Sequence, residues 1–352
     1  MSTIDRLARC STLRSKTGNG TTEPRALASG MRQRGSALLA VLWLTAALSA
    51  IAFTVARTVR AETERTSTDI DALRTYYLAT GSIDRALLWI EWGPHRDAND
   101  KARFFENPMP ILRFPYPTGE AITEIIPETA KLNINTATGL EFTALAMILG
   151  AGPDQAQAIA QGILDWRSGT PGGSFTEFDR YYMTLTPSFR AAHASFQQIE
   201  ELLLVRGVTP ALFYGSYTPD AQGRLVPHAG LRDCLSVYGA AGVLDVNTVE
   251  PAVMQAIGLA PEAAAGIVAM RNAMPIRDMG QLSAFNSGPG FGRLGMVPAS
   301  IATLRATARL RLPNGQMSDL RRSVSAMVKF LGPEWNPRFH ILRWYDNAYS
   351  IR

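Results

Sequence analysis

The first strong pattern along the chain is an apolar run from Ser36 to Ala56. It has 21 residues, and its polar members are serines and threonines. As an α-helix rising about 1.5 Å per residue it would span roughly 31 Å, close to the ~30 Å hydrocarbon core of a bilayer. Arg32 and Arg34 precede it, and basic residues tend to stay in the cytoplasm, so the chain that follows is expected outside. A secretory signal peptide is the alternative, but its apolar region is usually about 7 to 15 residues, so we predict a retained membrane helix.

The helix is predicted to continue beyond the membrane. Apolar residues recur at spacings of three and four from Ile70 to Ile90, and charged residues fill many of the other positions. Gly93-Pro94 ends the element. The first half of this helix is lipid-soluble, whereas the second half is amphipathic and is expected to pack lengthwise on a domain.

Alternating apolar and polar positions predict strands before and after a long helical region. Residues 136–295 are rich in alanine, are punctuated by glycine and proline, and are predicted to be helical. The fold class is therefore α+β, in which a long N-terminal helix packs on an antiparallel sheet and a large all-helical domain is inserted into that sheet. The predicted strands are Ala121–Ile126, Lys131–Ile134, Thr303–Leu312, Arg322–Phe330 and Phe339–Tyr345.

The helical region contains an internal repeat. Leu132–Thr136 returns as Leu244–Thr248, and each copy leads through an apolar helix to an arginine, Arg167 or Arg271. An asparagine in each copy is placed to cap the next helix, with the threonine after it as the alternative. Two copies of a small helical unit with capped helices explain the pattern completely. The capping candidates are Asn135 and Asn247, with Thr136 and Thr248 as alternatives.

Paired helices around a Gly-x-Gly turn also resemble the helix-hairpin-helix modules of DNA receptors. Gly150-Ala-Gly152 fits such a turn, but Gly258-Leu-Ala260 in the second copy fits poorly because the second glycine is replaced. Residues 1–35 hold seven of the 35 basic and two of the 30 acidic residues, so the remaining chain has 28 of each and no basic bias. Because no basic cluster surrounds the intact turn, a nucleic-acid partner is not favoured. A membrane-tethered helix-hairpin-helix DNA receptor is kept as the alternative hypothesis.

Patterns that indicate catalysis are weak. Gly290-Phe-Gly-Arg-Leu-Gly295 spells a dinucleotide fingerprint, yet no buried strand precedes it and no helix follows, so a loop is expected. The four histidines stand singly, and no Gly-x-Ser-x-Gly elbow or lysine-bearing phosphate loop is present. Cys10 and Cys234 fall on opposite sides of the membrane run, which excludes an intrachain disulfide. We therefore predict that the protein is not an enzyme.

Four short segments together resemble the general secretion pathway protein K family, the large minor pseudopilins of type II secretion systems. The resemblance covers about residues 31 to 345, and its most specific part is Leu-Val-Arg-Gly-Val-Thr-Pro. It implies a pilin-like fold whose inserted helical domain holds two helix-hairpin-helix or SAM-like repeats. The segments are Gln33-Arg-Gly35, Tyr76-Tyr77, the Leu-Asn-Ile-Asn-Thr repeat, and Glu201-Leu-Leu-Leu-Val-Arg-Gly-Val-Thr-Pro210.

The resemblance also implies how the chain is processed and where it works. Prepilin peptidase would cut between Gly35 and Ser36 on the cytoplasmic side, and Ser36 would then be N-methylated. The mature protein would cross the bacterial inner membrane once, with its bulk in the periplasm. It would sit at the tip of a pseudopilus, initiate its assembly and support the export of folded proteins across the outer membrane. Its partners would be minor pseudopilins I, J and H, the major pseudopilin G and prepilin peptidase.

The fifth mature position is a marker of the tip. Major pilin-like subunits carry a glutamate there, whose charge meets the N-terminal amine of a neighbour, because an unpaired charge in the apolar core is costly. Here the position is Ala40. An uncharged residue, which the family shares, suits a subunit with nothing stacked beyond it.

Calcium binding has two interpretations. Members of the family often follow the first Asp-Trp with further aspartates that resemble a calcium loop, since that hard cation needs oxygen ligands. This chain reads Asp165-Trp-Arg-Ser-Gly-Thr170, so Ser168 and Thr170 stand where carboxylates are expected. The interpretations are a solvated loop with stray acids and a weak site formed by Asp165, Glu177 and Asp179.

These patterns divide the chain into domains. Residues 1–35 are expected to be a cleaved cytoplasmic leader, and 1–30 to be disordered or an upstream extension ahead of Met31. The remaining domains are a transmembrane helix at 36–56, a pilin-like domain in two parts at 57–135 and 296–352, and the inserted helical domain at 136–295.

Overall fold

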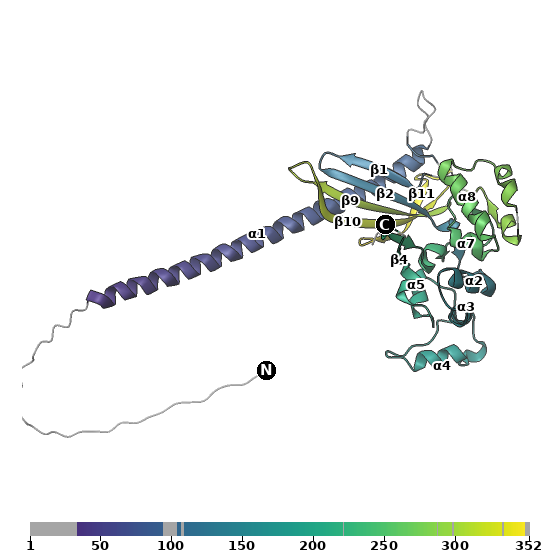
Figure 1. The fold of residues 1–352 in the computed structure, drawn as a ribbon, viewed down its shortest axis with the longest axis horizontal. Coiled ribbons are helices and arrows are strands. Elements are labelled where there is room, and N and C mark those ends of the chain that lie inside the picture. The colour runs from purple at the N-terminus through teal and green to yellow at the C-terminus, as the bar shows by residue number, and fades with distance from the viewer. Residues whose placement is uncertain are drawn as a thin grey trace, which may run out of the picture. The chain divides into compact units, whose positions relative to one another are not determined.

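The structure is a computed structural model that describes residues 34–93, 104–106, 109–220, 222–286, 288–297, 299–332 and 334–348 (Figure 1). The predicted leader lies outside the described residues, apart from Arg34 and Gly35. The chain divides into two units, residues 1–65 and residues 66–352.

Helix α1 (Arg34–Trp92) is the long helix that the apolar pattern predicts. Among the described residues it is the one helix long and apolar enough to cross a membrane, and its apolar segment is exposed. The hydroxyl of Thr45 donates to the Leu42 carbonyl at 2.9 Å, and that of Thr54 donates to the Ala50 carbonyl at 2.6 Å. Hydroxyls bonded to their own helix need no water, so these residues are compatible with hydrocarbon.

The second unit contains a five-stranded antiparallel sheet in the order β1-β2-β9-β10-β11. Strand β2 pairs with β9 from Gly119 against Leu310 to Pro127 against Ala302, so the chain leaves the sheet after β2 and returns to the neighbouring position. The strands are β1 (Ile111–Tyr116), β2 (Gly119–Pro127), β9 (Ile301–Arg311), β10 (Met317–Phe330) and β11 (Phe339–Tyr345).

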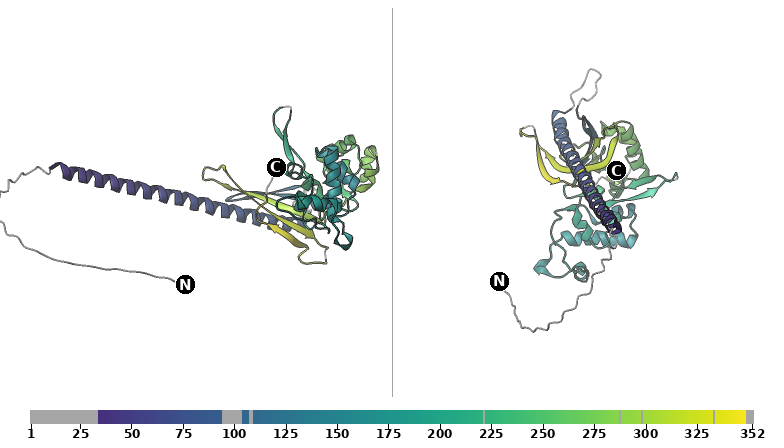
Figure 2. Two further views of the ribbon diagram at one scale, coloured as in Figure 1. Left: turned by 90° about the horizontal axis from the view of Figure 1, so that it is seen from below. Right: turned by 90° about the vertical axis from the view of Figure 1, so that its left-hand side faces the viewer.

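The C-terminal part of α1 lies along one face of this sheet (Figure 2). Ala79, Ile83 and Ala86 recur at helical spacing and are fully buried. They share a hydrophobic cluster with inward residues of the strands, such as Phe114 and Val324. The predicted α+β arrangement, a long helix on an antiparallel sheet, is confirmed.

Four of the five predicted strands belong to this sheet, but Lys131–Ile134 does not. A 3-10 turn at Glu128–Ala130 follows β2, and the residues after it, Leu132-Asn133 (β3), pair in parallel with Leu235-Ser236 (β6). The sheet instead has β1 as an edge strand that the pattern did not predict. Pro115 interrupts β1, and proline within an apolar run argues against a strand except at an edge.

Short helices and turns fill the segment between β2 and β9 and gather at one end of the sheet (Figure 1). They enclose a second hydrophobic cluster, which includes Trp166, Tyr182 and Phe196. The helices are α2 (Gly139–Ile148), α3 (Pro153–Arg167), α4 (Glu177–Met183), α5 (Pro210–Tyr214), α6 (Leu231–Cys234), α7 (Pro251–Ala256) and α8 (Pro261–Ala273). The remaining strands are β4 (Ser216–Pro219), β5 (Leu225–His228), β7 (Leu244–Asp245) and β8 (Leu294–Gly295).

Candidate functional site

The repeated asparagines do not cap helices, contrary to the prediction. The Asn135 side chain donates to the Phe196 carbonyl at 3.1 Å and accepts from the Phe196 N–H at 2.8 Å. Asn247 exchanges the same pair of bonds with Ile276, at 2.9 and 2.8 Å. Each asparagine therefore ties its repeat to a segment that follows the second helix of that copy.

The alternative caps are also wrong, because each helix begins later than expected. Thr138 caps α2 by accepting from the Glu141 N–H at 3.3 Å, and α7 follows Glu250 with a proline at its first position and no side-chain cap. Thr248 instead donates to Asp245 at 2.6 Å. A capping side chain must directly precede the first helical turn, which Asn135, Asn247, Thr136 and Thr248 do not.

The repeated arginines close each copy. Arg167 donates to the carbonyls of Ile134 and Ala137, both at 2.7 Å. Arg271 donates to the equivalent carbonyls of Val246 and Val249, at 3.0 and 2.7 Å. Burial lowers the pKa of both arginines, and the carbonyl bonds satisfy groups that would be costly to leave unpaired inside the protein.

Both copies form the same turn between their helices. Gly150 and Gly258 have φ of 100° and 103°, which favours glycine. The prediction that the second copy fits poorly is wrong, because Gly152 and its counterpart Ala260 have φ of −65° and −62°, which any residue adopts. The turn is therefore a shared structural element. Arg167, the first arginine after it in the sequence, is at the other end of α3 and is occupied by carbonyls.

A buried carboxylate organises the connection between α3 and α4. The Asp179 side chain is fully buried, and its Oδ2 accepts from the Thr176 N–H at 3.2 Å, from Arg190 Nε at 3.1 Å and from His193 Nε2 at 2.9 Å. Its Oδ1 accepts from the Ala191 N–H at 3.1 Å. Three of these four donors converge on Oδ2, which fully occupies that oxygen, whereas Oδ1 accepts one bond.

The two cations at Asp179 also bind backbone oxygens. Arg190 Nη2 donates to the carbonyls of Gly173 at 2.9 Å and Ser174 at 2.7 Å. His193 Nδ1 lies 3.2 Å from the Asp165 carbonyl oxygen and 3.1 Å from that of Ser168. Carbonyl and carboxylate oxygens only accept hydrogen bonds, so the His193 ring satisfies all three oxygens when both of its nitrogens carry a proton, as in the imidazolium form.

The pKa values at this cluster follow from these contacts. Burial raises the pKa of Asp179, but the bonds from His193, Thr176, Arg190 and Ala191 outweigh burial and lower it to about 2. Burial lowers the pKa of His193. The hydrogen bond to Asp179 and the negative charge of Asp179 outweigh burial, so the pKa is raised above its ordinary value. Burial is the main cause of a raised pKa at Asp165, which accepts from the Thr176 hydroxyl at 3.1 Å.

The structure brings together two of the three predicted metal candidates. Asp165 and Asp179 both contact Thr176, whereas Glu177 is exposed in the first turn of α4. No group of three or more His, Cys, Asp or Glu is placed to hold a metal ion in the part of the chain that the structure describes. Within α1, Gly35 and Ser36 lie in the first turn and Ala40 is exposed.

Sequence reasoning missed Arg190, His193 and Thr176 at this cluster. A signal for Thr176 was available, because Thr-Glu-Phe-Asp matches the Thr-x-x-Asp form of a capping box, and Thr176 and Asp179 form such a box at α4. No spacing rule points to Arg190 or His193, which lie 11 and 14 positions beyond Asp179. His193 also has a φ of 47°, which is uncommon for a residue with a side chain.

A second candidate surface is the exposed face of α1 within residues 66–92. Gly81 lies on this face, and a Cβ added there would meet no atom within 4 Å. A helix-interior glycine costs about 1 kcal/mol relative to alanine, and no contact within the described chain requires it. The apolar residues of this face, which we call the α1 stripe, are Ile70, Leu73, Tyr77, Leu88 and Trp92.

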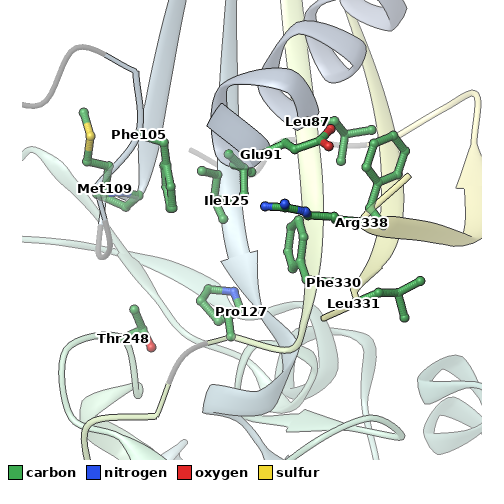
Figure 3. A pocket seen from close by; sticks show the side chains of 14 residues that line it. Leu87, Glu91, Phe105, Met109, Ile125, Pro127, Thr248, Phe330, Leu331 and Arg338 are labelled. Carbon is green, nitrogen blue, oxygen red and sulfur yellow. The ribbon is translucent and has the colours of Figure 1, made fainter. Parts of the chain in front are cut away.

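A cavity of about 290 Å³ opens beside the C-terminal end of α1 (Figure 3). Phe105, Ile125 and Phe330 contribute to its apolar wall, and Glu91 and Arg338 are its charged lining residues. The lining residues include no histidine, cysteine, serine or lysine. The cavity therefore offers a mainly apolar surface with one carboxylate, Glu91, and one guanidinium, Arg338.

Comparisons with known proteins identify part of the chain. Residues 127–215 match the family model described as type II secretion system (T2SS), protein K. A search of the curated proteins finds no match. Among solved structures, the chain matches the crystal structure of the GspK-GspI-GspJ complex from the type 2 secretion system of enterotoxigenic Escherichia coli. The matched chain is 15% identical, with a TM-score of 0.55 over 81% of this chain and 100% of the other.

The structural match concerns the fold of the chain, and the family match concerns one segment of its sequence. At 15% identity the structural match shows the fold, and the family model matches the segment that runs from the end of β2 to the end of α5. That segment holds the first repeat and the Asp179 cluster. Over residues 127–215 the resemblance seen in the sequence is supported by the match to the protein K model of type II secretion systems.

Proposed function

We propose that this protein is a minor pseudopilin of a type II secretion system that assembles with minor pseudopilins I and J. The observation that carries the proposal is a protein K domain on a chain whose α1 is long and apolar enough to cross a membrane. The fold of a chain from the GspK-GspI-GspJ complex adds support. The protein would be anchored once in the inner membrane and have its bulk in the periplasm.

The proposal includes a place at the pseudopilus tip. The protein would be cut between Gly35 and Ser36, methylated at Ser36, and would start assembly of a pseudopilus that contains minor pseudopilin H and the major pseudopilin G. Ala40 supports the proposed location at the tip, because a charged residue at that position would need a partner in the apolar core. It would act by assembly rather than catalysis.

The α1 stripe is the surface proposed for contact with the other pseudopilins. It lies opposite the helix positions that pack on the sheet, such as Ala79 and Ile83. Gly81 and Asp84 separate its two apolar groups, and exposed large apolar side chains gathered on one face are typical of surfaces that another protein covers. Gly81 between these groups would let a partner helix approach closely, as small residues do between packed helices.

Complex formation tests the proposal. Residues 66–352 form one compact unit, so this fragment can be mixed with the soluble domains of pseudopilins I and J and its mass measured by light scattering. We expect a heteromer that persists at high salt, because the proposed contact is apolar. Duplex DNA is the control, and salt-sensitive DNA binding without a heteromer would favour the receptor hypothesis instead. No contact in the described chain favours that hypothesis at present, since the Gly150 turn is followed by Asp154 and Arg167 is occupied.

Substitution of Gly81 distinguishes the role of the α1 stripe in association from its role in the stability of the fold. We expect Gly81→Leu to stabilise the isolated fragment by up to about 1 kcal/mol, because leucine is a better helix former and the position has open space. The same change should weaken the heteromer about tenfold or more, since added bulk in a packed contact costs roughly 1–3 kcal/mol. Chemical denaturation and titration by light scattering measure the two effects. Gly242→Leu, at an exposed glycine with equal space, is the control. Unchanged association of the Gly81 variant would remove this face from the interface.

A further inference from the structure

Five oxygen atoms surround the cationic side chains of Arg190 and His193. Four are backbone carbonyl oxygens, of Asp165, Ser168, Gly173 and Ser174, and the fifth is Oδ2 of Asp179, which both cations share. All five belong to the end of α3, the start of α4 or the connection between them. Carbonyl and carboxylate oxygens are the ligands that a hard divalent cation requires, and such ions often hold loops of this kind.

We propose that Arg190 and His193 are resident cations of this oxygen cluster and that they hold the α3–α4 connection without a metal ion. The inference does not depend on the proposed role in secretion. Ser168 and Thr170 stand where carboxylate ligands of calcium are expected. The proposal is that Arg190 and His193 take the place of that ion.

The geometry does not suit calcium at the predicted ligands. Oδ2 of Asp179 already has three donors, so a metal ion at that oxygen would have to displace at least one of them. The carbonyls of Asp165 and Ser168 are bonded to His193, and those of Gly173 and Ser174 to Arg190. A divalent ion would also stand beside two positive charges that repel it.

The two cations are themselves held in place. The Arg190 guanidinium lies 4.4 Å from the centre of the Phe175 ring, which adds a cation–π contact to its three hydrogen bonds. His193 has a side chain that is about nine-tenths buried, and its ring is bonded at both nitrogens. His193 is therefore buried, and Arg190, whose side chain is 35% exposed, is held at the surface by these contacts.

The proposal predicts that a calcium site is latent in the cluster. With both cations removed, the carboxylates of Asp165 and Asp179 and the freed carbonyls would form an oxygen set of the type that binds calcium. Arg190→Gln and His193→Asn together remove the charges and keep polar side chains, and asparagine tolerates the positive φ of position 193.

The experiment compares the full chain in detergent, with and without these substitutions, by thermal unfolding in chelator and in about 5 mM CaCl₂, a concentration above the dissociation constants of weak extracellular sites. We expect the unfolding temperature of the unsubstituted protein to change by less than about 1 °C between the two conditions. The double variant should unfold at least about 6 °C lower in chelator, and calcium should restore several degrees of the loss. Calorimetric titration with CaCl₂ should show binding to the double variant and none to the unsubstituted protein.

Arg224→Gln with His228→Asn is the matched control, because it makes the same two replacements at the β4–β5 hairpin, where Arg224 binds Asp220 and His228 binds Thr218. Both control residues are exposed. We therefore expect the unfolding temperature of the control, in chelator and in CaCl₂, to stay close to that of the unsubstituted chain. Stoichiometric calcium binding with stabilisation of the unsubstituted protein would overturn the proposal. A double variant as stable in chelator as the control would overturn it as well. If the double variant does not fold, the calcium titration of the unsubstituted protein is the test: no binding supports the proposal, and stoichiometric binding overturns it.

Discussion

Replacing Asp179 with asparagine is expected to lower the free energy of unfolding by roughly 3–5 kcal/mol, the cost of breaking a buried ion pair by removing one partner. The amide has the shape of the carboxylate but no charge, and its NH₂ group cannot accept from donors that now point at a carboxylate oxygen. Arg190 and His193 would keep their charges beside a neutral group. Denaturant unfolding followed by tryptophan fluorescence, to which Trp166 in the adjacent aromatic core contributes, measures the loss.

Asp220→Asn is the control for this substitution. Asp220 accepts from Arg224 Nε at 2.8 Å and from two backbone N–H groups, so its bonds resemble those of Asp179. The Arg224 side chain is 77% exposed, however, and exposed ion pairs contribute about 1 kcal/mol or less. Equal losses in the two variants would show that the buried cluster is no stronger than a surface pair.

The difference in stability between the unsubstituted protein and Asp179→Asn should depend on pH. The pKa of Asp179 is lowered from 3.8 to about 2, so its contribution is complete above pH 3.8 and is lost as the pH falls toward 2. The pKa of His193 is raised from 6.5, so its contribution is complete below pH 6.5 and is lost as the pH rises through the raised value. The difference should therefore be largest between about pH 4 and 6.5 and smaller on either side. A difference that does not vary from pH 3 to pH 8.5 would show that the charges of the two residues are not coupled.

Replacing Gly35 with leucine is expected to abolish maturation of the chain. The proposed cut lies between Gly35 and Ser36, and a bulky side chain directly before the scissile bond would occupy space that glycine leaves for the peptidase. The leader would remain attached to α1 and hold its arginines, Arg32 and Arg34, on the cytoplasmic side. Intact mass spectrometry of protein expressed with prepilin peptidase distinguishes the two forms.

The control for this substitution is Gly30→Leu, which makes the same change five positions earlier in the leader. We expect the control to be cut normally and to show Ser36, with a methyl group on its amine, as the first residue. A mature N-terminus at any other position, in the unsubstituted chain or in the control, contradicts the proposed processing. Normal cutting of Gly35→Leu would show that this position is not read by the peptidase.

The local patterns of the sequence determined the main elements of the pilin-like part. The length of α1 follows from an apolar run and a helical period that continue without interruption to Gly93. β9 and the second part of β10 follow from the alternation over Thr303–Leu312 and Arg322–Phe330, because one face of each strand packs against α1. The edge strand β1 was not predicted, since its proline and short length leave a signal that only its pairing with β2 makes meaningful.

The tertiary structure alone decided what the polar residues of the helical part do. Asparagine is a residue type that often caps helices. The hydrogen-bond partners of Asn135 and Asn247, Phe196 and Ile276, are nevertheless determined by where distant segments pack. The sequence also identified Asp165 and Asp179 as carboxylates that could share a site, but it contained no sign that Arg190 and His193 would meet Asp179. The physical reason is that helix and strand periods depend on neighbours within a few residues, whereas a buried charge is neutralised by whichever donors the fold brings within about 3 Å of it.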